Sequence, residues 1–244
     1  MRLLMRITAF LLLAVAIPLA LVAGGCADGI ARGKAEKEIL NVLPEIIGPA
    51  DSYQVKVDGS ASAMLKGELR GVRITGSNVR PEGLPRLARL EASARDVKVD
   101  TRTYRILSAQ QATWKGWLDE EELSEMLRDR VPYLQEVSVR VTADYVEASG
   151  RAAYGRVGAD GSVRAVPAVR NGREIWLLPR RVSALGVGAP VPDWAGQRVS
   201  SILNPVYVIP TEGLPLTVEK IATEPGLLRL EGSLDVTKLS APRQ

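Results

Sequence analysis

The chain has 244 residues, of which 46% are hydrophobic but only 5% aromatic, and it contains one cysteine and no histidine. The missing imidazole excludes Ser-His-Asp and Cys-His nucleophile systems, and the counts exclude metal sites built from imidazole or several thiolates. Residues 27–244 carry 30 basic and 28 acidic side chains, once Arg2 and Arg6 are subtracted from the 32 basic residues of the whole chain. Nucleic-acid binding needs a denser basic face than this. The composition therefore predicts a non-enzymatic protein with no cofactor, no metal and no nucleic-acid partner.

Residues 1–26 have the layout of a secretory signal peptide, in which two arginines precede an apolar run that ends in small residues. We therefore expect export to the periplasm or the outer face of the cell envelope. The segment "LVAGGC" resembles a bacterial lipobox, which implies a lipid on Cys26 and a tether to the membrane. An ordinary cleaved signal and an uncleaved N-terminal membrane anchor are the alternatives.

The first half of the remaining chain predicts one helix followed by strands. Apolar residues at helical spacing predict a helix over 27–47, with Pro44 near its end. Alternation of apolar and polar residues predicts a strand at 53–57. After the turn at Asp58-Gly59 we expect an extended segment over 64–79, and further strands with a turn between them over 88–117.

The second half predicts two shorter helices and a run of antiparallel strands. Asp119 is the expected N-cap of one helix, which Val131-Pro132 ends, and the other runs from Asp193 to Asn204. The dipeptides Asp160-Gly161 and Asn171-Gly172 are typical of two-residue hairpin turns. The acids at 120–122 could suggest a hydrolase carboxylate pair, but a helix N-terminus favours such charges without any catalysis.

Alternating strands indicate antiparallel sheet, so we expect one α+β domain over residues 27–240. The oily strand faces must be buried, and two arrangements achieve this. Either the sheet curls and fills with its own side chains, or it closes around a cavity that accepts an acyl chain. The pattern alone favours the filled core.

The segment "ILNPVYVIPTEGLPLTVEKIATEPGLLRLEGSLDV" resembles the bacterial LmeA-like phospholipid-binding family, and "EMLRDRVPYLQEVSVRVTADYVEASGRA" and "VKVDGSASAMLKGELRGVRITGSNV" are similar to other parts of it. The resemblance implies a fold like that of tubular lipid-binding domains, with a long curved antiparallel sheet wrapped around one long helix and two shorter helices beside it. It also implies an exported, membrane-associated protein that binds phospholipid or another acyl lipid and maintains envelope lipids. The alternative is a non-catalytic structural or partner-binding envelope protein with a solid core.

Two groups of residues are candidates for lipid contact. The first shares an inward, aliphatic position on alternating strands and would line a cavity: Val139, Val141, Leu228, Leu230 and Leu234. The second would contact headgroups or a membrane surface: Arg170, Arg173, Arg180, Arg181, Trp114 and Trp117. Solvated strand faces for the arginines, and packing at a sheet rim for the tryptophans, are the alternatives.

Overall fold

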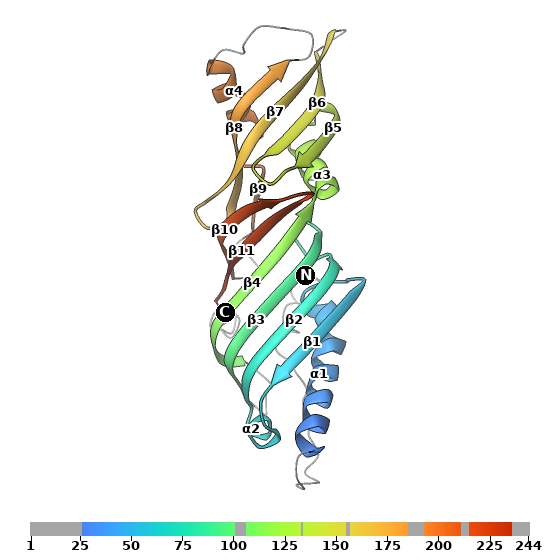
Figure 1. Ribbon diagram of the computed structural model, residues 1–244, viewed down its shortest axis with the longest axis vertical. Helices are drawn as coiled ribbons and strands as arrows, with labels where there is room; N and C mark the ends of the chain where they lie inside the picture. Colours follow the sequence, from blue (N-terminus) through green and yellow to red (C-terminus); the bar gives the residue numbers. More distant parts are fainter. Residues whose placement is uncertain are drawn as a thin grey trace, which may run out of the picture. The chain divides into compact units, whose positions relative to one another are not determined.

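The structure is a computed structural model that describes residues 26–100, 106–132, 134–154, 157–184, 193–210 and 215–235 (Figure 1). Of the expected leader, residues 1–26, all but Cys26 lie outside this range. The chain divides into two compact units: residues 1–115, 211–216 and 232–244 form unit 1, and residues 116–210 and 217–231 form unit 2. Among the described helices, none has the length and apolar character that crossing a bilayer requires.

Helices and predominantly antiparallel strands make this an α+β protein, as the sequence predicts. The helices are α1 (Cys26–Ile46), α2 (Ala61–Leu65), α3 (Glu120–Arg130) and α4 (Asp193–Leu203). One sheet has the order β1-β2-β3-β4-β11-β10, with β1 (Ser52–Asp58), β2 (Glu68–Val79), β3 (Leu87–Val99), β4 (Ile106–Asp119), β10 (Leu216–Glu224) and β11 (Leu227–Leu234). The other has the order β5-β6-β7-β8-β9, with β5 (Leu134–Val141), β6 (Val146–Tyr154), β7 (Val157–Arg170), β8 (Glu174–Ala184) and β9 (Tyr207–Val208).

Two features differ from the single sheet around one long helix that the resemblance implies. The described strands form two sheets, and the four described helices have 21, 5, 11 and 11 residues, so the one long helix is not confirmed. The additional helix is α2, which occupies the start of the segment expected to be extended. Ser60 caps it, because its Oγ accepts a hydrogen bond from the backbone N–H of Ala63 at 3.3 Å.

The hairpin turn at Asn171-Gly172 is confirmed, whereas the one at Asp160-Gly161 is wrong. Asn171 and Gly172 have φ of 52° and 65°, and the Arg173 N–H donates to the Arg170 carbonyl at 3.0 Å, which closes the turn. The ladder pairs Arg170 with Glu174, so the connection has three residues instead of the expected two. Asp160 and Gly161 lie inside β7, where Gly161 pairs with Gly150 on one side and with Ala184 on the other. Pairing on both sides outweighs the local turn preference, and the β6–β7 ladder continues to Tyr154 opposite Val157.

Helix side chains bond to the backbone of the edge strands β1 and β5. Glu36 of α1 accepts from the Val57 N–H at 3.0 Å, and Glu120 of α3 accepts from the Val141 N–H at 2.7 Å. Each glutamate precedes its amide by 21 residues. These bonds satisfy donors that a sheet edge otherwise leaves open, and they tie each helix to its strand. They also give Glu120 a structural role, and the neighbouring Asp119 caps α3, since its carboxylate accepts from the Glu122 N–H at 2.9 Å.

Asn204, which follows α4 and is only 5% exposed, binds the backbone of β8. Its Oδ1 accepts from the Leu177 N–H at 2.6 Å, and its Nδ2 donates to the Leu177 carbonyl at 2.7 Å. The amide therefore takes the place of a neighbouring strand at this position.

We predict that Asn204→Ala lowers the free energy of unfolding by about 2–4 kcal/mol, because two buried backbone groups lose their partner. Urea unfolding of the purified protein measures this. The control is Gln197→Ala, at an exposed position in α4, which should change stability by less than about 0.5 kcal/mol. Equal stability of the two variants would contradict the role assigned to Asn204.

Candidate functional site: an apolar cavity under the first helix

In unit 1, α1 packs against the sheet through one apolar face. Ala35, Ile39 and Leu43 recur every four residues and are at most 5% exposed. They form one buried cluster with residues of β1, α2, β2 and β3, namely Val55, Val57, Met64, Leu69 and Val97. Asp28 adds a hydrogen bond between α1 and the start of α2, since its carboxylate accepts from the Ala61 N–H at 2.7 Å. These contacts fix the helix over the sheet.

A cavity of about 200 Å³ remains between α1 and the sheet. Its helix side consists of Ile39, Val42, Leu43, Ile46 and Ile47. Its sheet side is contributed by β2, β3, β4 and Leu234 of β11, and all of the lining residues belong to unit 1. Ser93, Thr113 and Trp114 are the lining residues whose side chains contain a polar atom. The cavity therefore offers contact area to a ligand and few directional bonds.

The cavity stays unfilled because the sheet presents small side chains to the helix. Ala92 and Ala94 of β3 and Ala109 and Ala112 of β4 line it, and each side chain ends at Cβ. Protein interiors are normally packed to the density of organic crystals, so an unfilled space of this size is unusual. An apolar cavity of about 150 Å³ stays dry and binds benzene. This space is of similar size, and it is smaller than the roughly 300–1,000 Å³ typical of sites for larger ligands.

Leu234, one of the five residues expected to line a cavity, lines this one. Val139, Val141, Leu228 and Leu230 are buried in unit 2 and are absent from the lining of this cavity. Contact between these four and a lipid stays a prediction. Sequence reasoning missed the alanines. Their alternation at 92 and 94 indicates a strand face that points inward, but it does not show whether the space opposite that face is filled.

The two tryptophans of the second group are both buried, at 7% exposure, as in the packing alternative. Trp117 donates from Nε1 to the Glu224 carboxylate at 3.1 Å, and Glu224 is bonded by Arg229 at 2.6 Å. Trp114 lines the cavity, and its Nε1–H has no hydrogen-bond partner among the described residues. The fold thus leaves one buried donor unsatisfied in the side chains that form the cavity wall.

The four arginines of the second group all lie in unit 2, and none lines the cavity. The Arg170 guanidinium stacks on the Trp176 ring at 3.9 Å, and Arg173 donates to the Pro210 carbonyl at 3.5 Å. Arg180 and Arg181 are exposed at a β-bulge in the β7–β8 ladder. Membrane or headgroup contact by these side chains stays a prediction.

Tyr53 holds the chain just beyond α1, where its hydroxyl donates to the Gly48 carbonyl at 2.7 Å. Burial raises the pKa of this phenol from 10.0 to about 12, because the interior disfavours the charged phenolate. A raised pKa in the folded state contributes stability that is complete below about pH 10 and is lost as the pH rises towards about 12.

We predict that the stability of the protein falls between about pH 10 and pH 12 and that Tyr53→Phe removes part of this fall. Chemical denaturation across this range, with Tyr53→Phe beside the parent chain, measures the effect. A variant that loses stability over this range as steeply as the parent chain would show that Tyr53 titrates normally.

The fold and the cavity define an α+β protein whose first helix covers an apolar space on an antiparallel sheet. The model of the LmeA-like phospholipid-binding family matches residues 26–233, and the chain belongs to this family. Comparison with curated proteins gives no match, and comparison with solved structures gives none either.

Proposed function

We propose that this protein is an exported phospholipid-binding protein that holds an acyl chain in the cavity under α1 and serves to maintain lipids of the cell envelope. Membership of a phospholipid-binding family supports the ligand class. The observation that carries the location is the apolar cavity itself, whose lining is aliphatic except for three residues. Helix α1 over a curved sheet also supports the likeness to tubular lipid-binding domains.

Acyl binding here rests on apolar contact. Each methylene moved from water into the cavity contributes about 0.8 kcal/mol. A few methylenes therefore give useful affinity without any specific hydrogen bond, and the aliphatic lining is suited to chains of varied structure. The cavity holds part of one chain, and the remainder of the lipid lies outside it.

The proposed activity is binding and not catalysis. Among the described residues, no group of three or more potential metal-ligating side chains is gathered. Of the acidic run at 120–122, Glu120 is bonded to the backbone of β5, and the preceding Asp119 caps the helix. Membership of a binding family supports the same conclusion.

Membrane association is part of the proposal. Cys26 is the first residue of α1, so a lipid attached there would tether the helix that covers the cavity directly to the membrane. Arg180 and Arg181 would add electrostatic attraction to anionic lipids.

A partner-binding protein is the second candidate, and one observation favours it. Trp194 at the start of α4 is 69% exposed, and tryptophan is enriched at protein interfaces. A partner-binding protein without lipid would leave the cavity unused, so lipid binding separates the two candidates.

We predict that Ala92→Leu lowers acyl-lipid affinity by about tenfold or more, because its added carbons take space that two or more methylenes of the ligand would fill. Uptake of a fluorescent fatty acid and of a labelled phospholipid measures this. Thermal unfolding should show stability unchanged or raised by about 1 kcal/mol.

Ala143→Leu is the matched control, since it adds the same carbons at an exposed position between β5 and β6. It should bind lipid as the parent chain does. A parent chain that takes up no lipid, or an Ala92→Leu variant that binds as well as the control, would overturn the proposed site.

A further inference from the structure

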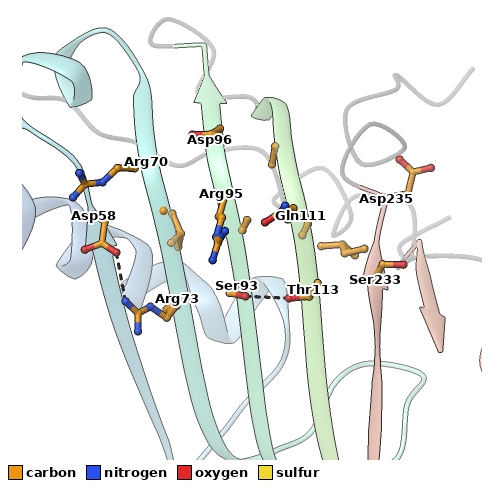
Figure 2. A pocket seen from close by; sticks show the side chains of 16 residues that line it. Asp58, Arg70, Arg73, Ser93, Arg95, Asp96, Gln111, Thr113, Ser233 and Asp235 are labelled. Atoms are coloured by element: carbon orange, nitrogen blue, oxygen red, sulfur yellow. Dashed lines mark hydrogen bonds and ion pairs between the residues drawn. The ribbon is translucent and has the colours of Figure 1, made fainter. Parts of the chain in front are cut away.

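A polar groove of about 1,070 Å³ lies on the face of the first sheet that points away from α1 (Figure 2). Val72 and Ala94 pack against the buried cluster beneath α1, so the next residues along their strands, Arg73 and Arg95, face the other way. All of the lining residues belong to unit 1. The volume reaches the upper end of the roughly 300–1,000 Å³ typical of ligand sites, so the groove has room for a ligand that lies wholly on this face.

Gly71 leaves a space in the floor of this groove. It is paired with Asp58 of β1 on one side and with Arg95 of β3 on the other, so these two side chains stand beside a position that has none. The atoms nearest to a Cβ built on Gly71 are two of Asp58, at 3.5 and 3.7 Å, and the Ala94 carbonyl oxygen at 3.8 Å. No atom of Arg95 is among them, so the space opens towards that guanidinium.

Two guanidinium groups are available beside this space. Arg95 makes no hydrogen bond or ion pair with a described residue, and it lies between Arg73 and Gln111 in Figure 2. Arg73 contacts Asp58 at 3.5 Å in an exposed pair, which is weak enough to exchange for a ligand. Guanidinium forks match phosphate oxygens in geometry and charge. This part of the groove therefore suits a phosphate group.

The part of the groove towards β4 and β11 has neutral polar side chains. The Ser93 and Thr113 hydroxyls lie 3.1 Å apart, and Gln111 and Ser233 line the groove beside them. Hydroxyl and amide groups both donate and accept hydrogen bonds, as the hydroxyl groups of a sugar or another polyol do. A phosphate alone would leave this part of the groove unused, so the ligand is expected to carry hydroxyl groups as well.

Two residues of the groove have unusual backbone conformations. Asp96 in β3 has φ of 46° and Gln111 in β4 has φ of 48°, in the left-handed region that non-glycine residues rarely adopt. Such conformations are concentrated at ligand sites, where a side chain has to be redirected. Carboxylates also line the groove, where they accept hydrogen bonds from hydroxyl groups and repel a ligand that carries negative charge alone: Asp58, Asp96 and Asp235.

We propose that this groove binds a phosphorylated polyol, with the phosphate over Gly71 at Arg95 and Arg73 and the hydroxyl groups along β4 and β11. The ligand lies wholly on the outer face of the sheet, so the site does not depend on the acyl-binding cavity. A soluble sugar phosphate has this chemistry, and so does the polyol phosphate headgroup of a lipid whose acyl chains stay in a bilayer.

The test is calorimetric titration of the purified protein with glucose 6-phosphate, glucose and inorganic phosphate. Glucose 6-phosphate should bind about tenfold or more tightly than either of the other two, because both of its parts are bound. Arg95→Gln should lower this affinity by about tenfold, through loss of charge-assisted hydrogen bonds. Gly71→Val should remove binding, since its side chain fills the space. Arg80→Gln, exposed in unit 1 outside the groove, is the control.

A second assay identifies the source of the ligand. Sedimentation with phosphatidylcholine vesicles, with and without phosphatidylglycerol, measures binding to a polyol phosphate headgroup. Losses in Arg95→Gln and Gly71→Val, with the control unchanged, support the site, and the assay in which they occur shows whether the ligand is soluble or a headgroup.

Three results would overturn the site: a parent chain that shows neither interaction, Arg95→Gln and Gly71→Val variants that match the control in both assays, or inorganic phosphate bound as tightly as glucose 6-phosphate. Uptake of a fluorescent fatty acid by the same variants should equal that of the parent chain, because neither Arg95 nor Gly71 lines the cavity under α1. This uptake also shows that the variants are folded. Failure of the groove would therefore leave acyl binding standing, and failure of acyl binding would leave the groove.

Discussion

The distance between α1 and its sheet is the constraint on which the proposed site depends. Buried contacts through Ala35, Ile39 and Leu43 and the bond from Glu36 to the edge of β1 hold the helix in place. The sheet beneath the second half of the helix presents alanines that do not reach it. Because these contacts fix α1, the helix does not move closer to the small side chains of the sheet, and the space between them stays open.

Stability and binding use overlapping parts of one helix. Ile39 and Leu43 belong both to the packed cluster and to the cavity lining, whereas Val42, Ile46 and Ile47 line the cavity and are only partly buried. Apolar side chains left partly uncovered in this way gain free energy when a hydrocarbon covers them.

Much of the secondary structure could be predicted from sequence, because local signals determine it. The stripe on α1, the cap at Asp119 and the turn at Asn171-Gly172 depend on residues close in the chain. Asp160-Gly161 carries an equally strong turn signal, but it was outweighed by pairing on both sides of β7. The alanines that border the cavity were not identified from the sequence for a related reason. Alternation shows that Val139 or Leu228 is buried, but not whether the space opposite is filled, which depends on helix placement.

The central claim is that a hydrocarbon chain lies between α1 and the alanines of β3. The most direct measurement is a set of nuclear Overhauser contacts between an isotope-labelled fatty acid and the methyl groups of the intact protein. The account predicts contacts from the acyl methylenes to the methyls of Ile39, Ile46 and Ala92. Contacts confined to Val139, Val141, Leu228 or Leu230, or none at all, would contradict it.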